Sequence, residues 1–531
     1  MPADAVFRNG VILTVDGTNP RATAVAIRNG RIMAVGDDTE IDSLINTRTR
    51  VIDLAGRTLM PGLNDNHCHP MGYGASLGWI DASPRSAATL EEIQQRYRVA
   101  AGTANTGAWL RGSGYDDTRL DVQRHPTRWD LDPVTAGHPA ILTRTCGHIS
   151  VVNSAALELA GVTRDTPNPV GGEIQHDDHG EPTGLLLERA QMLVQNKIPH
   201  NTVSDIKRAL IASGDKFLSM GITSVAEAGI SSSDQLMAYQ DLRTSGELPV
   251  RTYLMMMIDE TLQPLSQLGI RTGFGDEWLR IGPAKLFQDG SGGGRTAAMF
   301  RHYPGQPENF GITIQTQEQL DEKFLAAARA GFQGAAHAIG DRAIDMIITA
   351  YERALAAYPQ RDGRWRIEHC GMMTPRLLAR MKQLNLLAVP QPAFVYYLGD
   401  SYLRNFSEDA LDLAYPARSW FDLGIIAIGS SDTPVIPADP WTNIRAAVTR
   451  LTQDGATMGP MQGVTIDEAL RMFTLHGAIG SFEEKLKGTI TVGKLADLIV
   501  IDQDPRSIKA EQLNTIRTDL TMLGGEIVFE R

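Results

Sequence analysis

The middle of the chain alternates short apolar runs with longer stretches rich in Ala and Leu. The longer stretches, such as 204–221 and 317–331, are typical of helices. The eight apolar runs lie at 62–69, 223–229, 250–256, 281–287, 331–338, 364–370, 386–392 and 425–434. Alternating strand-like and helix-like segments indicate βα units around a parallel sheet. Because eight such units close a barrel, the pattern predicts an α/β protein with a (β/α)8 TIM-like barrel.

The two ends of the chain differ from the middle. They contain short Val- and Ile-rich segments separated by turn-forming pairs such as Asn-Gly and Asp-Gly. We expect 1–60 and 485–531 to form one small split β-sandwich domain, which would bring the two ends together. The barrel then occupies 61–484. The stretch at about 71–222 is too long for one crossover, so we expect a long insertion there, with a strand in ILTRTCGHI.

Composition and charge exclude several classes of protein. The chain of 531 residues has a net charge of -12, which argues against a nucleic-acid backbone or a membrane surface as partner. It shows no secretory signal pattern and no apolar stretch of about 20 residues, so we expect a soluble, cytoplasmic protein. Three cysteines are too few for a disulfide framework or a Cys-rich zinc module. We expect a small-molecule substrate and, because symmetric dimers are common, a homodimer.

Polar side chains end several of the apolar runs, and chemistry in such barrels sits at the carboxyl ends of the strands. The first run ends in His67-Cys68-His69. Because side chains at i and i+2 of a strand share a face, His67 and His69 can hold one cation while Cys68 points away. The other polar side chains in comparable places are Lys285, His337, His369 and Asp432. A lone histidine at a strand end is most often an ordinary hydrogen-bonded residue, but this combination predicts a site for Zn²⁺ or a similar metal.

Lys285 lies inside an apolar run, where a lysine ordinarily extends its amine to solvent. Beside bound cations and partly desolvated, its pKa would fall, and a neutral amine can react with carbon dioxide to form a carbamate. A carboxylated lysine is an anionic oxygen ligand that can bridge two metal ions roughly 3.5–4 Å apart. We favour this interpretation over an unmodified lysine beside a single metal ion.

Four further residues are weaker candidates for contacts with substrate. His148 and Tyr115 lie in the expected insertion, where each could line the pocket or serve only the structure. Arg295 follows Ser291 and three glycines, and could meet an anionic group of the substrate. Gln391 ends the seventh apolar run, where we expect it to point towards the barrel mouth.

The motifs PGLNDNHCH, AHAIGD, IEHC and GSSDTP, with Lys285 in IGPAKLFQDGS, together resemble those of the amidohydrolase superfamily. The chain looks most like the YtcJ-like branch that includes N-substituted formamide deformylases (amidohydrolase family 3), over essentially its whole length. The resemblance implies a (β/α)8 barrel with a split β-sandwich. Carried over position by position, it implies a metal site of His67, His69, Lys285, His337, His369 and Asp432. Cys68 departs from the family pattern, and its thiol could be inert or sensitive to oxidation.

The resemblance also implies hydrolysis of an amide-type C–N bond, for example in an N-formyl, N-acyl or cyclic amide, with one or two Zn²⁺ ions as cofactor. The metal would lower the pKa of bound water towards about 7, and Asp432 would act as general base or serve only as a ligand. Deamination of an amino-heterocycle is one alternative. Deaminases of this superfamily often place a Glu near the histidine of the fifth strand, whereas Ala336 and Ala338 flank His337 here. A non-catalytic barrel scaffold is the other alternative, which the retained ligands disfavour.

Overall fold

The computed structural model describes the chain except for positions 20, 85, 118, 146, 148 and 170. The residues fall into two compact units, one of 1–74 with 203–531 and the other of 75–202. Each unit has its own sheets and its own clusters of buried apolar side chains.

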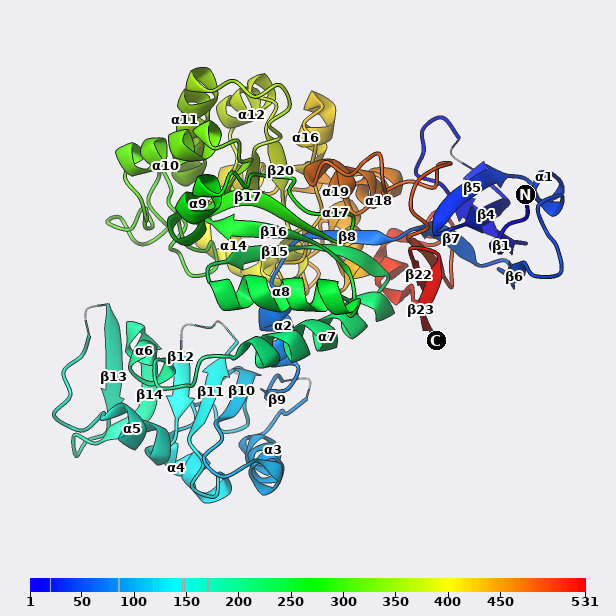
Figure 1. Ribbon diagram of the computed structural model, residues 1–531. Helices are drawn as coiled ribbons and strands as arrows, with labels where there is room; N and C mark the ends of the chain where they lie inside the picture. Colours follow the sequence, from blue (N-terminus) through cyan, green and yellow to red (C-terminus); the bar gives the residue numbers. More distant parts are fainter. Residues whose placement is uncertain (20, 85, 118, 146, 148, 170) are drawn as a thin grey trace. The chain divides into compact units, whose positions relative to one another are not determined.

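The first unit is built around a seven-stranded sheet in which every neighbouring pair is parallel (Figure 1). In spatial order its strands are β20 (Leu387–Val389), β19 (Arg366–His369), β18 (Gly334–Ala338), β17 (Leu279–Phe287), β16 (Arg251–Met257), β15 (Ile222–Ile230) and β8 (Leu63–Cys68). Each falls on one of the first seven apolar runs of the sequence. Most of their residues are buried, as expected for parallel strands covered on both faces.

The eighth apolar run, 425–434, does not form a regular strand. It meets β20 through one parallel bridge between Ala388 and Ala427, and the Ala388 N–H donates to the carbonyl of Ile426 at 3.1 Å. Towards its other end the Asp432 N–H donates to the carbonyl of His67 in β8 at 2.7 Å. The segment therefore contacts both edge strands, and the seven-stranded sheet is nearly closed.

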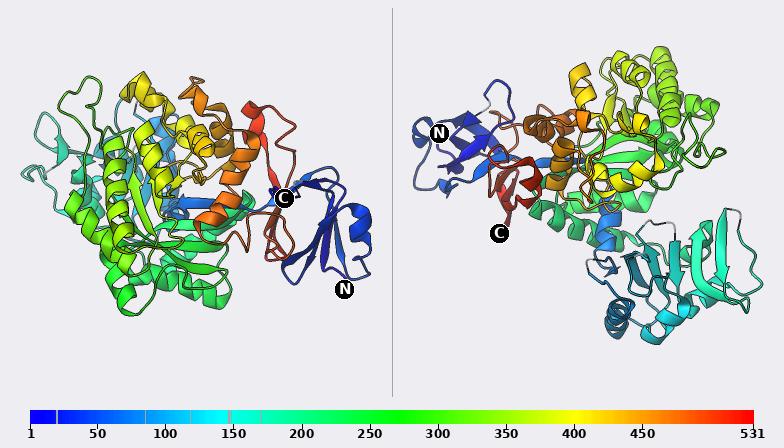
Figure 2. Two further views of the ribbon diagram at one scale, coloured as in Figure 1. Left: turned by 90° about the horizontal axis from the view of Figure 1, so that it is seen from above. Right: turned by 180° about the vertical axis from the view of Figure 1, so that it is seen from behind.

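Helices cover the outside of this sheet (Figures 1 and 2). The principal ones are α7 (Val203–Ser219), α8 (Ser233–Ser245), α9 (Ile258–Gln267), α10 (Gln317–Arg329), α11 (Asp341–Ala357) and α12 (Pro375–Gln383). In α11 the side chains of Ile344, Ile347, Ile348 and Tyr351 recur at helical spacing and are fully buried. This apolar stripe packs the helix against β18 and the neighbouring α10.

Shorter helices complete the first unit. They are α1 (Asp38–Asp42), α2 (Pro70–Ser76), α13 (Ala393–Tyr397), α14 (Gly399–Asn405), α15 (Glu408–Leu411), α16 (Ala417–Leu423), α17 (Pro440–Thr449), α18 (Ile466–Met472) and α19 (Leu475–Gly480). Several begin at side-chain caps; in α18, for example, Thr465 and Glu468 satisfy each other's backbone N–H groups.

Two small sheets join the ends of the chain (Figure 1). One runs β23 (Glu526–Glu530), β22 (Thr518–Leu523), β21 (Leu498–Ile501), β7 (Thr58–Pro61), β2 (Val11–Leu13) and β3 (Arg21–Ala22). The other runs β5 (Arg31–Gly36), β4 (Ala24–Arg28), β1 (Ala5–Arg8) and β6 (Arg50–Asp53). Apolar side chains of both sheets, including Phe7, Ile27, Leu59 and Val500, share one core. The pairing of β7 with β21 brings segments far apart in the sequence side by side.

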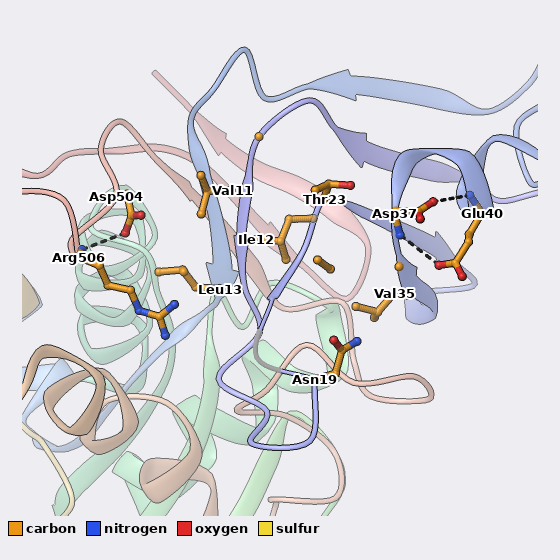
Figure 3. Close-up of a pocket in the computed structure, with 13 residues that line it drawn as sticks. Val11, Ile12, Leu13, Asn19, Thr23, Val35, Asp37, Glu40, Asp504 and Arg506 are labelled. Carbon is orange, nitrogen blue, oxygen red and sulfur yellow. Dashed lines mark hydrogen bonds between the residues drawn. The ribbon is translucent and has the colours of Figure 1, made fainter.

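A cavity of about 570 Å³ is lined by residues of both small sheets (Figure 3). Val11, Ile12 and Leu13 of β2 give it an apolar wall, while Asp37 and Glu40 are already engaged with each other's backbone N–H groups. None of the residues expected to bind metal or substrate lines this cavity. It is therefore distinct from the candidate site described below.

The second unit, 75–202, contains a six-stranded sheet. Its spatial order is β13 (Gly172–His176), β14 (Pro182–Glu188), β12 (Ile149–Val152), β11 (Ala140–Arg144), β10 (Leu110–Tyr115) and β9 (Ile80–Asp81). Its helices are α3 (Leu90–Thr103), α4 (Arg128–Leu131), α5 (Ser154–Ala160) and α6 (Met192–Gln195). The strand expected in ILTRTCGHI is β11. Among all residues that the structure describes, no helix combines the length and apolar character needed to cross a membrane.

Candidate metal centre

His67 and His69, from the carboxyl end of β8, approach the same carboxylate. Their Nε2 atoms lie 3.4 Å and 3.3 Å from Asp432 Oδ1. Ligand atoms of the three side chains all lie within 4.8 Å of one another, which is close enough to hold one ion. Cys68, between the two histidines, directs its sulfur towards the Ala226 carbonyl at 3.7 Å. The alternation expected along the strand therefore places both imidazoles together and the thiol elsewhere.

His369, His337 and Lys285 lie beside these three residues. The ring centroid of His369 is 4.8 Å from that of His67 and 4.3 Å from that of His337. Lys285 is completely buried, with its ammonium 4.5 Å from the centre of the Phe287 ring. Burial first, and the charge of Lys285 as a further cause, lower the pKa of His67, His337 and His369. The structure thus places His369, His337 and Lys285 near the group of His67, His69 and Asp432, and binding of a metal by all six stays a prediction.

Two of the buried imidazoles are held by neighbouring side chains. His67 Nδ1 lies 2.6 Å from Glu368 Oε2, and His369 Nδ1 lies 2.6 Å from Gln391 Oε1. Both partners are completely buried. Hydrogen bonds of this kind fix the rotation of each ring before any ligand arrives.

A third imidazole, that of the mostly buried His337, is held by the loop after β17. Its Nε2 lies 3.0 Å from the carbonyl of Gly290 and 3.4 Å from Asp289 Oδ1. Asp289 in turn accepts backbone N–H groups of Ile339 at 3.0 Å and Gly340 at 2.8 Å. Burial raises the pKa of Asp289 to about 7. The carboxylate therefore ties the loop after β17 to the segment that follows β18.

Burial also governs protonation within the cluster. It lowers the pKa of His337 to about 4 and that of Lys285 to about 8, and it raises the pKa of Glu227 to about 7. His69 differs: burial opposes its charged form, but Asp432 and Glu227 outweigh burial and raise its pKa. His337 is therefore neutral at pH 7, as a metal ligand must be.

One side of the cluster is accessible. The side chains of His69 and His337 are 32% and 13% exposed, whereas His67 is 1% exposed. The cluster is therefore partly exposed at His69 and His337.

Two residues of the cluster have left-handed backbone conformations. The φ angle is 68° at His369 and 61° at Asp432, a region that residues other than glycine rarely adopt. Such conformations persist only where the surrounding structure holds them, and they concentrate at functional sites. At His369 the turn allows this residue and its neighbour Glu368 both to contact His67. A regular strand would send their side chains to opposite faces.

Two of the weaker candidates for substrate contact, Gln391 and Arg295, lie in the first unit and are engaged in hydrogen bonds within the protein. Gln391 is fully buried, and its amide joins His369 to the Ser430 hydroxyl, which accepts from Nε2 at 2.9 Å. It is thus placed to support His369 rather than to point freely towards a substrate. Arg295 donates from Nε to Asn405 Oδ1 at 2.8 Å and so anchors its glycine-rich loop on α14.

The remaining candidates belong to the second unit. Tyr115 ends β10, is fully buried and lies 3.0 Å through its hydroxyl from His125 Nδ1. His148 lies outside the described residues. A role for either residue in substrate binding stays a prediction.

Besides Asp289, the charged residues Glu368, Arg366 and Glu227 lie near the histidines and were not singled out from the sequence. Glu368 and Arg366 are completely buried, and Arg366 Nη2 donates to Glu368 Oε2 at 3.0 Å. Glu227 Oε1 lies 3.8 Å from His69 Nδ1. The sequence did contain an indication for Arg366 and Glu368. They lie at i and i+2 of an otherwise apolar strand, so they share one face, and charged residues rarely lie buried without a partner.

The donor set fits a divalent cation. Neutral imidazoles with a carboxylate are the nitrogen and oxygen ligands that Zn²⁺ prefers. The Nζ of Lys285 finds no hydrogen-bond partner within the described part of the chain, which is costly for a buried cation. A nearly closed parallel sheet with such a cluster at the carboxyl ends of its strands is an arrangement typical of metal-dependent enzymes.

The chain belongs to the Amidohydrolase family, whose sequence profile matches residues 50–529. It is therefore an enzyme, a hydrolase acting on carbon–nitrogen bonds.

Named relatives span nearly the whole chain. The chain is 32% identical to the protein LONG AFTER FAR-RED 3 of Arabidopsis thaliana, over 97% of this chain and 90% of that protein. It is 30% identical to a Bacillus subtilis protein named as the amidohydrolase YtcJ, over 99% of each chain. It is also 30% identical to the N-substituted formamide deformylase of Arthrobacter pascens, over 99% of this chain and 98% of that enzyme.

A solved structure shares the fold. The crystal structure of a metal-dependent hydrolase from Pyrococcus furiosus is 28% identical and superimposes with a TM-score of 0.78. The match covers 94% of this chain and 99% of that one.

Proposed function

We propose that this enzyme hydrolyses an amide-type C–N bond of a small molecule, with N-formyl amines, N-acyl amines and cyclic amides as the substrate classes. The observation that carries the proposal is the convergence of His67, His69 and Asp432, whose ligand atoms lie within 4.8 Å of one another. The name of the Arthrobacter relative, an N-substituted formamide deformylase, supports the choice of bond.

The proposal includes the metal. The residues that would hold one or two Zn²⁺ ions are His67, His69, Lys285, His337, His369 and Asp432. When bound, a divalent cation lowers the pKa of a water molecule and polarises a carbonyl oxygen. Lys285 would take part as a carbamate. Because burial lowers its pKa to about 8, part of the amine is neutral near pH 7; its lone pair bonds to the carbon of CO₂ and one N–H proton is released.

Asp432 is the residue placed to move protons. Its Oδ1 lies 3.3 Å from His69 Nε2, on the accessible side of the cluster. It accepts a proton from the attacking water and later donates that proton to the leaving nitrogen, so that the amine departs uncharged. Glu368 and Gln391 keep the imidazoles in place during both transfers.

The proposal extends to the architecture. Segment 425–434, which hydrogen-bonds to β20 and to β8, would complete a (β/α)8 barrel within 61–484. The small sheets, formed from 1–60 and 485–531, would make up the split β-sandwich.

A hydrolysis screen tests the proposed function. Zinc-loaded enzyme is incubated with panels of N-formyl amines, N-acyl amines, carbamates, cyclic amides and amino-heterocycles, and the released amine, acid or ammonia is measured. We expect turnover in the N-formyl, N-acyl or cyclic-amide panel, and loss of that turnover after chelation. Release of ammonia from amino-heterocycles alone would instead establish the deaminase alternative. A folded, zinc-loaded enzyme inert towards every panel would contradict hydrolysis.

A further inference from the structure

The hydrogen bond between Glu368 and His67 determines which nitrogen of that imidazole remains free. A carboxylate paired with an arginine can only accept, so the Nδ1 of His67 carries the hydrogen. The lone pair is then on Nε2, the atom 3.4 Å from Asp432 Oδ1. His67 is thereby set to bind a cation through Nε2.

The free nitrogen of His369 and that of His337 are set in the same way, by hydrogen bonds to an amide oxygen and to a backbone carbonyl. The amide nitrogen of Gln391 donates to the Ser430 hydroxyl, which turns its oxygen towards His369 Nδ1 and leaves Nε2 free. The carbonyl of Gly290 accepts from His337 Nε2, which leaves Nδ1 free. Of these three rings, His67 has the direct hydrogen bond to a carboxylate, at 2.6 Å, whereas the Asp289 carboxylate lies 3.4 Å from His337 Nε2, which is hydrogen-bonded to the Gly290 carbonyl.

Building on the proposed function, we propose that Glu368 is a positioning residue that strengthens metal binding by His67. A hydrogen bond to an ionised acceptor is about twice as strong as a neutral one. Partial transfer of the Nδ1 proton towards Glu368 makes the ring more basic at Nε2. Glu368 therefore holds the His67 ring in one orientation, and it makes Nε2 a stronger electron-pair donor to a metal ion.

Arg366 holds Glu368 in this role. Its Nη2 donates to Glu368 Oε2 at 3.0 Å and to the carbonyl of Asn66 at 2.6 Å. Because Asn66 directly precedes His67, one guanidinium connects the carboxylate that orients the ring with the backbone that carries it. A buried ion pair contributes little net stability compared with apolar residues, so stability alone does not account for charges at this position.

The test compares two variants that each leave a buried arginine without its carboxylate. Glu368→Gln removes the charge beside His67. Asp497→Asn removes the carboxylate that accepts from Arg251 Nε at 2.6 Å and Nη2 at 3.0 Å, where both side chains are 3% exposed. The zinc dissociation constant is measured by competition with a chromophoric chelator, and thermal unfolding of the metal-free proteins is measured alongside. We expect both variants to unfold at lower temperature.

Only Glu368→Gln should weaken zinc binding, by about 10- to 100-fold, the usual effect of removing such a partner. Asp497→Asn should keep the wild-type affinity. If Glu368→Gln does not fold, Glu368→Asp keeps the charge opposite Arg366 while withdrawing it from His67, and weakened affinity is again expected. Wild-type zinc affinity in the folded Glu368 variant would overturn the proposal while leaving the proposed function intact. A wild-type protein that binds no zinc would overturn both.

Discussion

Replacing Asp432 with asparagine should lower kcat by about 10² to 10⁴-fold, the usual contribution of a positioned general base. The amide keeps the shape of the side chain but cannot accept the proton of the attacking water. Asp432 Oδ1 lies within 3.4 Å of the Nε2 atoms of both His67 and His69, the position expected of a base beside a metal-bound water. The measurement is steady-state kinetics at saturating zinc, on the substrate found in the screen.

Kinetics at saturating zinc distinguish the two roles open to Asp432, that of a general base and that of a metal ligand only. If the residue is only a ligand, Asp432→Asn should recover most of its kcat once enough zinc is present to fill the site. A persistent loss with full metal content supports proton transfer. Asp497→Asn, which removes a buried carboxylate paired with Arg251, serves as the control and should keep its kcat.

Replacing Lys285 with methionine should lower the activity of the enzyme without lowering the stability of the metal-free protein. The buried ammonium has no hydrogen-bond partner within the described part of the chain, so a similarly long apolar side chain should not lower the unfolding temperature of metal-free protein. Activity should fall by about 10² to 10³-fold, the effect of losing one preorganised electrostatic group. Calorimetry on the metal-free proteins and kinetics on the zinc-loaded proteins measure the two effects.

The carbamate itself is tested by intact-protein mass spectrometry under non-acidic conditions. Wild-type enzyme prepared with bicarbonate should carry an increment of about 44 Da, which the methionine variant lacks. Equal zinc content and equal kcat in wild type and Lys285→Met would show that Lys285 holds no metal.

Much of the sheet could be predicted from the sequence because parallel strands covered on both faces are nearly continuous apolar runs. Seven runs match β8, β15, β16, β17, β18, β19 and β20. The run 425–434 begins with apolar residues but continues as GSSDTP; it makes one bridge to β20 and turns at Asp432, where φ is 61°. The conformation of one residue depends on its surroundings in the fold, which periodicity does not report.

The residues of the candidate site could also be predicted in part from the sequence. Residues at strand ends, such as His337 and His369, could be found because the fold brings all strand ends together. The spacing of Arg366 and Glu368 indicated that they pair, but not that Glu368 contacts His67, because alternation along a strand sends Glu368 and His369 to opposite faces and the left-handed turn at His369 breaks that rule. Gln391 was expected to face a substrate, but its hydrogen bonds to His369 and Ser430 depend on packing between segments distant in the sequence.

Metal content tests the central claim most directly. The enzyme is purified from zinc-supplemented, bicarbonate-containing medium, and bound metal per chain is measured by inductively coupled plasma mass spectrometry. We expect at least one Zn²⁺ per chain, and two where Lys285 is carboxylated. Protein that is folded but carries no divalent metal, and that takes up none when titrated with zinc, would contradict the account.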